Sequence, residues 1–369
     1  MANYPRTWTE IKLENIQHNV RVIRQLLSPG CLFMAVVKAD GYGHGAVEVA
    51  KAALAAGADR LGIATVEEGR QLREAGIEAP MHLLTGFYPG QAQVISELDL
   101  IPAIFTDEQL NELKNLNKPL AINIKVDTGM SRLGLNVKQA PDFIEKVRQN
   151  KNLQIEGLFT HFATADEVGS PFAEQQLKEF NTLLENLAKQ GYLFKVNHAA
   201  NSAAAILNPA SQLQMVRVGI ALYGLHPSGA TKDRIDLKPA LSWYSKLSLV
   251  KEVKAGLSVS YGATYAAQKT EVIGTVPVGY ADGYSRRLSN NTDVLIRGEK
   301  VKQIGRICMD QMMVRLDQVQ TQVGEKVILI GKEANTEISA DDLASKLGTI
   351  NYEIVCGIAA RVPRHYEHI

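Results

Sequence analysis

The sequence lacks a long apolar run, a strong charge of either sign and a paired set of cysteines. No stretch of about 18 apolar residues occurs, so we expect no transmembrane helix. The N-terminus "MANYPRTWTEIKLENIQHN" has no basic segment followed by an apolar one, so we expect no secretory signal. The formal net charge is +1, which gives no reason to expect binding to nucleic acid or to an anionic membrane.

The three cysteines, Cys31, Cys308 and Cys356, are odd in number and far apart along the chain. Because Cys31 and Cys356 lie in apolar runs, we expect buried thiols there rather than disulfides. The sequence also lacks HExxH, Walker A and CxxC patterns, and we expect no metal site. Together with the missing signal, these features predict a cytoplasmic enzyme.

The first part of the chain contains eight apolar runs of strand length. They lie at 31–38, 60–65, 80–86, 100–106, 120–127, 154–162, 193–201 and 214–224. Most are nearly continuous in apolar residues, as strands buried on both faces are. Helix-like segments lie between several of them, at 44–56, 66–76, 107–115, 139–149 and 172–190. This alternation predicts an α/β fold, a (β/α)8 TIM barrel, with a doubly wound sheet as the alternative.

After about residue 235 the pattern changes to alternating apolar and polar residues separated by Gly and Asn turns. Such alternation predicts a mostly antiparallel β domain. We therefore expect a barrel over residues 1–235 and a C-terminal β domain over residues 236–369, joined at the polar segment "HPSGATKDRIDLKP". Residues 1–10 precede the barrel pattern and can pair with the β domain.

Two short motifs suggest other functions. The segment "GYGHGA" (41–46) satisfies the G-x-G-x-x-G/A pattern of dinucleotide-binding folds, follows a strand and opens a helix. However, Lys38 and Asp40 stand where a tight dinucleotide turn needs small or apolar residues. The triplet Asp-Thr-Gly at 127–129 occurs in aspartic proteases, but those enzymes need a second such carboxylate and none is present.

Polar side chains, with two residues that can offer backbone N–H groups, gather at the predicted carboxyl ends of the strands, where barrel enzymes carry their active sites. They are Lys38, Lys125, Asp127, Arg132, His161, Asn201, Ser202, Arg217, Gly219 and Ile220. Each alone can be a solvated or structural residue, but together they suggest a site. Ser202, Gly219 and Ile220 follow the last two strands, where barrels commonly bind phosphate. A phosphate site with a strand-end lysine predicts pyridoxal 5'-phosphate (PLP), held by Lys38 as a Schiff base.

Eight segments, taken in order, resemble the alanine racemase family. They are "AVVKADGYGHG", "KVDTGMSRLG", "HAANSAA", "RVGIALYG", "SYGATY", "VGYADGY", "GRICMDQ" and "NYEI". They run from residue 35 to residue 354 and so cover nearly the whole chain. The resemblance implies the same barrel with an appended β domain, PLP as cofactor, and a homodimer whose active sites are shared between subunits.

The resemblance also implies roles for individual residues. Lys38 would be one catalytic base, and Tyr261 from the other subunit would be the second. The PLP phosphate would be bound by Tyr42, Ser202, Gly219, Ile220 and Tyr352, with Asn201 beside them. Arg217 would face the pyridine nitrogen, His161 would lie next to Arg217, and Arg132 would contact both PLP and the substrate carboxylate. Met309, Asp310 and Tyr280 would bind or admit the substrate, and Lys125 matches a position that some members carbamylate.

The implied function is two-base racemisation of alanine, which supplies D-alanine for peptidoglycan. Two bases on opposite faces of Cα allow a proton to leave one side and return to the other. Lys38 and Tyr261 have ordinary pKa values near 10, so nearby cations must lower them. We expect Arg217 and the protonatable His161 to favour the tyrosinate. The alternatives are a broader racemase acting on serine or lysine, and a non-catalytic PLP-binding regulatory protein.

Overall fold

The structure is a computed structural model that describes residues 5–367. The chain divides into two compact units. One, the barrel unit, takes residues 15–41 and 45–238. The other, the β unit, takes the described residues up to Glu14, residues 42–44 and the residues from Pro239 onward. A short piece of the chain, which includes Tyr42, therefore belongs to the β unit although both flanking segments belong to the barrel unit.

The barrel unit is built on a parallel sheet. Its strands are β2 (Leu32–Val36), β3 (Arg60–Ile63), β4 (Met81–Leu83), β5 (Leu100–Ile104), β6 (Leu120–Asp127), β7 (Leu135–Asn136), β8 (Leu153–Phe159) and β9 (Met215–Val218). Neighbouring strands from β2 to β6 follow sequence order, β8 pairs with β6, and β9 pairs with β2. A doubly wound sheet would reverse its order at a switch point. The predicted barrel is therefore confirmed, and the dinucleotide-fold alternative is wrong.

The seventh predicted strand, 193–201, does not form a regular strand. Only an isolated bridge joins Phe159 to His198. The segment still closes the ring, because His198 N donates to Leu158 O at 3.0 Å and Arg217 N donates to Ala200 O at 3.0 Å. It runs so close to β8 that a Cβ on Gly157 would lie 1.9 Å from a backbone oxygen of this segment. Irregular backbone thus replaces a strand between β8 and β9.

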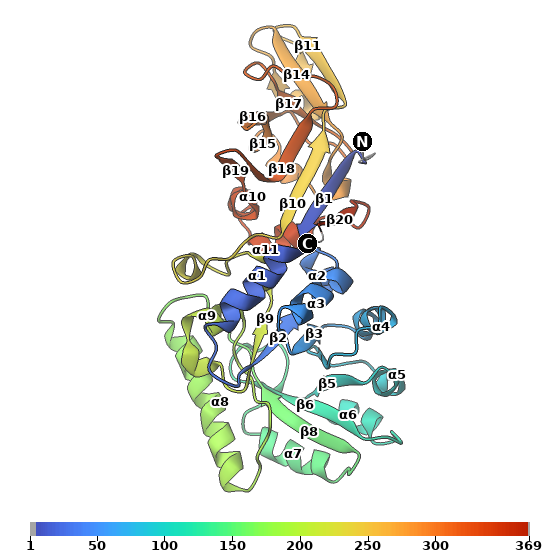
Figure 1. The fold of residues 1–369 in the computed structure, drawn as a ribbon, viewed down its shortest axis with the longest axis vertical. Helices are drawn as coiled ribbons and strands as arrows, with labels where there is room; N and C mark the ends of the chain where they lie inside the picture. The colour runs from blue at the N-terminus through green and yellow to red at the C-terminus, as the bar shows by residue number, and fades with distance from the viewer. Residues whose placement is uncertain (1–4, 368–369) are drawn as a thin grey trace. The chain divides into compact units, whose positions relative to one another are not determined.

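Helices surround the barrel strands (Figure 1). They are α1 (Leu13–Arg24), α3 (Ala46–Ala55), α4 (Val66–Glu74), α5 (Ala92–Glu97), α6 (Asp107–Leu113), α7 (Ala140–Arg148), α8 (Pro171–Lys189) and α9 (Ser202–Leu207). Thr106 caps α6, since its side chain accepts a hydrogen bond from Gln109 N. Of these helices, α1, α5 and α9 were not predicted.

The β unit contains one large, mostly antiparallel sheet, and Figure 1 labels most of its strands. Its members are β1 (Thr7–Lys12), β10 (Leu241–Lys246), β11 (Leu249–Val253), β14 (Glu271–Val276), β15 (Asp293–Ile296), β16 (Glu299–Ile304), β17 (Met312–Arg315), β18 (Lys326–Glu333), β19 (Thr336–Ile338) and β20 (Arg364–Glu367). Strand β1 pairs with β10 and β20, so this early segment lies within the sheet. Helices α10 (Ala340–Leu347) and α11 (Asn351–Cys356) complete the unit.

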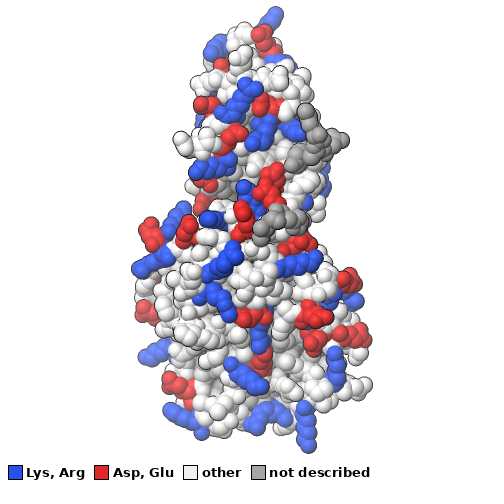
Figure 2. Space-filling model, viewed as in Figure 1, with Lys and Arg blue, Asp and Glu red and all other residues white. Residues whose placement is uncertain are grey.

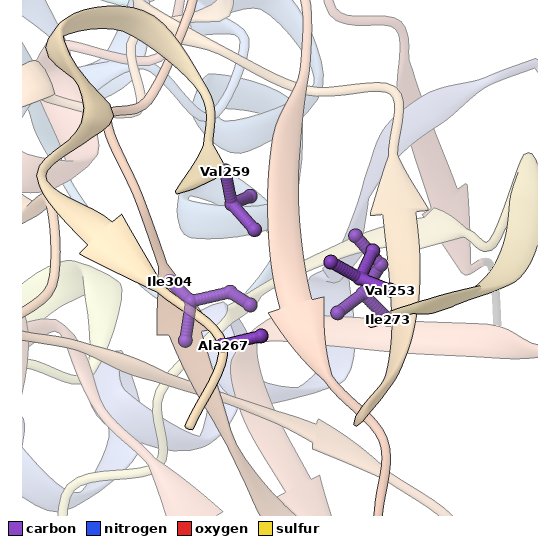
Figure 3. Close-up of a cluster of buried hydrophobic side chains, with 5 residues drawn as sticks. All are labelled: Val253, Val259, Ala267, Ile273 and Ile304. Atoms are coloured by element: carbon purple, nitrogen blue, oxygen red, sulfur yellow. The ribbon is translucent and has the colours of Figure 1, made fainter. Parts of the chain in front are cut away.

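A separate hairpin, β12 (Ser258–Val259) and β13 (Tyr265–Ala266), is attached to this sheet by a small apolar cluster. The cluster consists of Val253, Val259, Ala267, Ile273 and Ile304, all buried (Figure 3). Val259 and Ala267 lie on the two sides of the hairpin, and the other three lie on strands of the sheet. The cluster therefore fixes both ends of the loop that connects β12 to β13.

Acidic and basic side chains are mixed over the visible face of the molecule (Figure 2), as the near-neutral net charge leads one to expect. No helix within residues 5–367 has the length and apolar character needed to cross a bilayer. The thiol prediction is half right: Cys31 is buried, but Cys356 is exposed. Cys356 is the last residue of the short helix α11, whose buried positions are Asn351 and Val355.

Candidate active site

Lys38 lies just beyond β2, at the start of an unusual left-handed turn, α2 (Lys38–Tyr42). Ala39, Asp40 and Tyr42 have φ values of 51 to 52°, a region that costs a residue with a side chain about 1–2 kcal/mol. Two carboxylates hold the turn. Asp40 accepts from Ala46 N at 2.9 Å, and Glu68 accepts from Ala39 N at 2.7 Å. The backbone that carries Lys38 is therefore fixed on both sides of the turn.

Arg217, on β9, is a buried guanidinium whose acceptors are all neutral. Its Nη1 donates to His198 Nδ1 at 2.7 Å, and its Nη2 lies 3.0 Å from His161 Nδ1. Nη2 also donates to the backbone oxygens of Thr160 and Ala199 at 2.8 and 2.9 Å. Burial lowers the pKa of Arg217 from 12.5 to about 9, so it remains charged at neutral pH. Its Nε–H donates to no atom of residues 5–367 and is available to a bound group.

The histidines around Arg217 are neutral. Burial and then the charge of Arg217 lower the pKa of His161 and of His198 well below 6.5. At neutral pH Arg217 is therefore the charged member of this group, and His161 adds no second charge. Because Nδ1 of each ring accepts from Arg217, Nε2 must carry the ring proton. His161 can thus act as a hydrogen-bond donor, but it does not act as a cation.

Two further cations stand near this group, and both are among the predicted site residues. Lys125, on β6, is buried, and its Nζ donates to Val126 O at 3.0 Å. Burial and the nearby Arg217 lower the pKa of the Lys125 ammonium to about 7. Arg132 is exposed, and its guanidinium makes no hydrogen bond within the described part of the chain. The charges of Lys125, Arg132 and Lys38 all depress the pKa of His161, which places the four residues in one electrostatic neighbourhood.

Polar backbone and a hydroxyl form a cradle beside these cations. Ser202 begins α9 and is buried, and its Oγ accepts from Gly219 N at 2.9 Å. Asn201 caps the helix by accepting from Ala204 N at 3.0 Å. Ile220 begins a 3-10 turn, η2 (Ile220–Tyr223), so its N–H has no acceptor within that turn. Hydroxyl and N–H donors at two helix starts fit a phosphate group.

Tyr42 and Tyr352, the other predicted phosphate ligands, lie together in the β unit. Their ring centroids are 6.1 Å apart. Burial raises the pKa of Tyr42, and the neighbouring Tyr352 raises it further, so its hydroxyl keeps its proton and can donate. Gly43, the next residue, has a φ of 79° and packs so tightly that a Cβ would lie 2.3 Å from Val355 O.

Tyr261 lies at the tip of the hairpin formed by β12 and β13. The residue is 69% exposed, so its ring is not packed in the core of this unit. Ser260 and Gly262 on either side have φ values of 68° and 70°. Ser260 Oγ donates to Arg306 O at 2.6 Å and fixes the turn. The exposed phenol is therefore presented by a rigid turn that rests on the cluster of Figure 3.

Met309 and Tyr280 are also exposed in the β unit, beside an ion-pair network of which only the central carboxylate is buried. Asp282, which is fully buried, accepts from Arg6 and Arg361 at 2.7 Å each. The turn that contains Tyr280 and Asp282 donates backbone N–H groups to Cys308 O and Met309 O at 3.1 and 3.0 Å. Asp310 pairs with Arg361 at 2.7 Å. The network holds the segment that carries Met309 and Asp310 against the turn that carries Tyr280.

The structure thus brings Lys38, Lys125, Arg132, His161 and Arg217 together in the barrel unit, with Asn201, Ser202, Gly219 and Ile220 on its last strand ends. It places Tyr42, Tyr261, Tyr280, Met309, Asp310 and Tyr352 in the β unit.

Sequence reasoning missed His198, although this residue begins the quoted segment "HAANSAA". Only the pairing of Phe159 with His198 reveals that its ring enters the barrel interior, stacked on Phe159 at 4.7 Å.

Comparisons with known proteins agree with this architecture. Residues 11–227 match the family described as alanine racemase, N-terminal domain, and residues 240–366 match alanine racemase, C-terminal domain. The chain is 46% identical to an alanine racemase of Symbiobacterium thermophilum, over 98% of this chain and 97% of the relative. It is 44% identical to one of Halothermothrix orenii, with the same coverage.

Solved structures show the same likeness. An alanine racemase from Bacillus anthracis with bound L-Ala-P superposes with a TM-score of 0.95 at 39% identity, covering 100% of this chain and 96% of that one. One from E. faecalis superposes with a TM-score of 0.94 at 39% identity, covering both chains fully.

Proposed function

The chain belongs to the alanine racemase family and is an isomerase of alanine, and we propose that it works at the strand-end site around Lys38 with PLP as cofactor. The observation that carries this proposal is Arg217, a buried cation with neutral acceptors and a spare Nε–H. When bound, PLP makes the α-proton of an amino acid removable by withdrawing electrons from Cα.

The donor set of the barrel unit fits this cofactor. The Lys38 amine would hold the aldehyde carbon, and Ser202, Gly219 and Ile220 would bind the phosphate. Tyr42 and Tyr352 would add phenol donors to the phosphate. Asn201 would keep the first turn of α9 in place. Arg217 can donate to a pyridine nitrogen but cannot give up its proton near neutral pH, so that nitrogen would remain an unprotonated acceptor.

Two groups would exchange the α-proton from opposite faces. Lys38 would serve one face after the substrate displaces it, and Tyr261 of the partner subunit would serve the other. His161 supports the second role, because its Nε2–H can donate to a phenolate oxygen while Nδ1 stays bound to Arg217. The exposed apolar side chains of Tyr261, Tyr280 and Met309 are the kind of surface that a second subunit covers, which favours a homodimer with shared sites.

Substrate binding would depend on charge. Arg132 has a free guanidinium and would pair with the alanine carboxylate. Met309 would contribute a backbone N–H, with Asp310 and Tyr280 beside it.

A Lys125 amine with a pKa of about 7 is largely uncharged above neutral pH and can therefore react with CO2. The resulting carbamate would be an anion able to orient Arg132. We further propose a cytoplasmic enzyme that supplies D-alanine for peptidoglycan.

A substrate comparison tests the proposal. The purified protein, with and without added PLP, is incubated with L-alanine, L-serine and L-lysine, and loss of optical rotation is followed. We expect rapid racemisation of alanine only. Equal rates on serine or lysine would support the broader racemase, and PLP uptake without any racemisation would support the regulatory protein. Lys38→Arg should abolish both covalent PLP uptake and racemisation, and retention of both would refute the assignment of Lys38.

A further inference from the structure

The interior of the barrel contains a column of polar side chains that begins at Arg217. Barrel interiors are usually filled by Val, Ile and Leu. Here the column continues through His198, His82 and Arg60 to Glu156, and the two histidines are fully buried. The proposed function uses none of these last four residues, so their presence in the interior needs another explanation.

The members of the column contact one another in sequence. Arg217 Nη1 donates to His198 Nδ1 at 2.7 Å. The His198 ring meets the His82 ring edge to face, with centroids 6.1 Å apart and an interplanar angle of 86°. His82 Nε2 lies 2.9 Å from Arg60 Nη1, and the same Nη1 lies 2.7 Å from Glu156 Oε1. Arg60 on β3 and Glu156 on β8 thus connect two strands that are not neighbours in the sheet.

These contacts determine the protonation of both rings. His198 accepts from Arg217 through Nδ1, so its proton is on Nε2. His82 accepts from Arg60 through Nε2, so its proton is on Nδ1, which faces the side-chain amide of Asn123 at 2.9 Å. Asn123 Oδ1 has no partner among the described residues, and rotating the amide by half a turn would bring this oxygen to the ring proton. Each ring then has one defined tautomer.

We propose that Glu156 is a positioning residue for Arg217, acting through Arg60, His82 and His198. Glu156 is the one carboxylate in the column; the other members are neutral or cationic. The backbone oxygens of Thr160 and Ala199 hold Nη2 of Arg217, but Nη1 has only His198 Nδ1 as its acceptor among the described residues. The direction of Nη1 therefore depends on where the His198 ring stands. Glu156 orients Arg60 by a charge-assisted hydrogen bond, Arg60 selects the tautomer of His82, and the His82 ring limits how His198 can rotate.

The test compares Glu156→Gln with a matched control. Asp59→Asn removes a carboxylate that is also partly buried in the barrel unit. Asp59 precedes Arg60 in the chain, but its carboxylate pairs with Arg24 at 2.8 Å and accepts from Phe33 N at 2.7 Å, and it makes no hydrogen bond or ion pair with a side chain of the column. In Glu156→Gln we expect the ring nitrogen signals of His198, measured by NMR on 15N-histidine-labelled holoenzyme, to change from one tautomer to a mixture. We also expect kcat to fall about tenfold with KM within about twofold, as disturbance of a coupled network can produce.

The control and a second variant make the outcomes decisive. Asp59→Asn should lower the melting temperature while leaving the His198 signals and kcat unchanged. Should Glu156→Gln alone not fold, Arg60→Gln with Glu156→Gln removes both charges and carries the same expectation. Unchanged His198 signals together with an unchanged kcat in a folded variant would overturn the proposal. This inference rests on the proposed function only where kcat is measured. If the wild-type enzyme were inactive, the proposed function would be refuted, but the NMR measurement of His198 would still test the column.

Discussion

At the scale of single residues, the barrel unit buries cations that no carboxylate neutralises. Arg217 and Lys125 are both buried, and each is hydrogen-bonded only to neutral acceptors within the described residues. Removing a cation from water without a counter-charge costs several kcal/mol, and it lowers the pKa. The barrel therefore maintains a positive field at its strand ends, which favours an anionic cofactor and a carboxylate substrate.

The buried Lys125 predicts a pH-dependent stability difference. Its pKa falls from 10.5 in the unfolded chain to about 7 in the folded one. Between pH 7 and pH 10.5 the unfolded chain binds a proton at Lys125 that the folded chain does not bind. The free energy of unfolding therefore decreases as the pH falls through this range and increases as the pH rises. Lys125→Met should therefore stabilise the protein by on the order of 5 kcal/mol at pH 7, and the gain should shrink by about 1.4 kcal/mol per pH unit toward pH 10.

Urea unfolding in CO2-free buffer at several pH values would measure this difference. Adding bicarbonate at pH 8 should stabilise the wild-type protein but not the Lys125→Met variant, because only the amine can form a carbamate. A stability difference that stays constant from pH 7 to pH 10 would show that Lys125 keeps an ordinary pKa.

At the scale of elements, apolar runs predicted the strands well because both faces of a barrel strand are buried. Charge states and backbone geometry were not predictable in the same way. His161 is neutral because burial, and then the charge of Arg217 beside it, lower its pKa, and both causes arise only in the folded chain. In the turn after Lys38, three residues that are not glycine, Ala39, Asp40 and Tyr42, have positive φ, which no sequence pattern indicated. Only tertiary contacts, such as those of Asp40 and Glu68, can hold such residues there.

Replacing each of two glycines that have the same φ by alanine distinguishes the cost of backbone strain from the cost of steric overlap. Gly43 and Gly30 both have a φ of 79°, but a Cβ on Gly43 would lie 2.3 Å from Val355 O and one on Gly30 would meet nothing within 4 Å. Gly30→Ala should cost about 1–2 kcal/mol of stability from strain alone. Gly43→Ala should cost about 2 kcal/mol more through steric overlap. Equal losses in urea unfolding would show that the Tyr42 turn is not tightly packed.

At the scale of the whole molecule, the ordered motifs predicted the family and the two kinds of fold, and they contain most residues of the candidate site. The barrel column was missed because its members, such as His82 and Glu156, are far apart in sequence and meet only through strand register. Tyr261 could be assigned only by resemblance. Its exposed position on a rigid hairpin agrees with a role toward a second subunit. No sequence pattern in the β unit indicates what the phenol would react with.

Subunit complementation tests whether two chains build each site. Lys38→Ala and Tyr261→Phe should each be nearly inactive alone. If the partner supplies Tyr261, a hybrid dimer has one site with both defects and one intact site, which combines Lys38 of one chain with Tyr261 of the other. Random exchange of the two variants should then restore about one quarter of the wild-type activity, since half of the dimers are hybrids with one working site. Mixing each variant with itself provides the control. If each chain instead completed its own site, mixed samples would stay as inactive as the separate variants, and circular dichroism on both would show whether the loss came from unfolding.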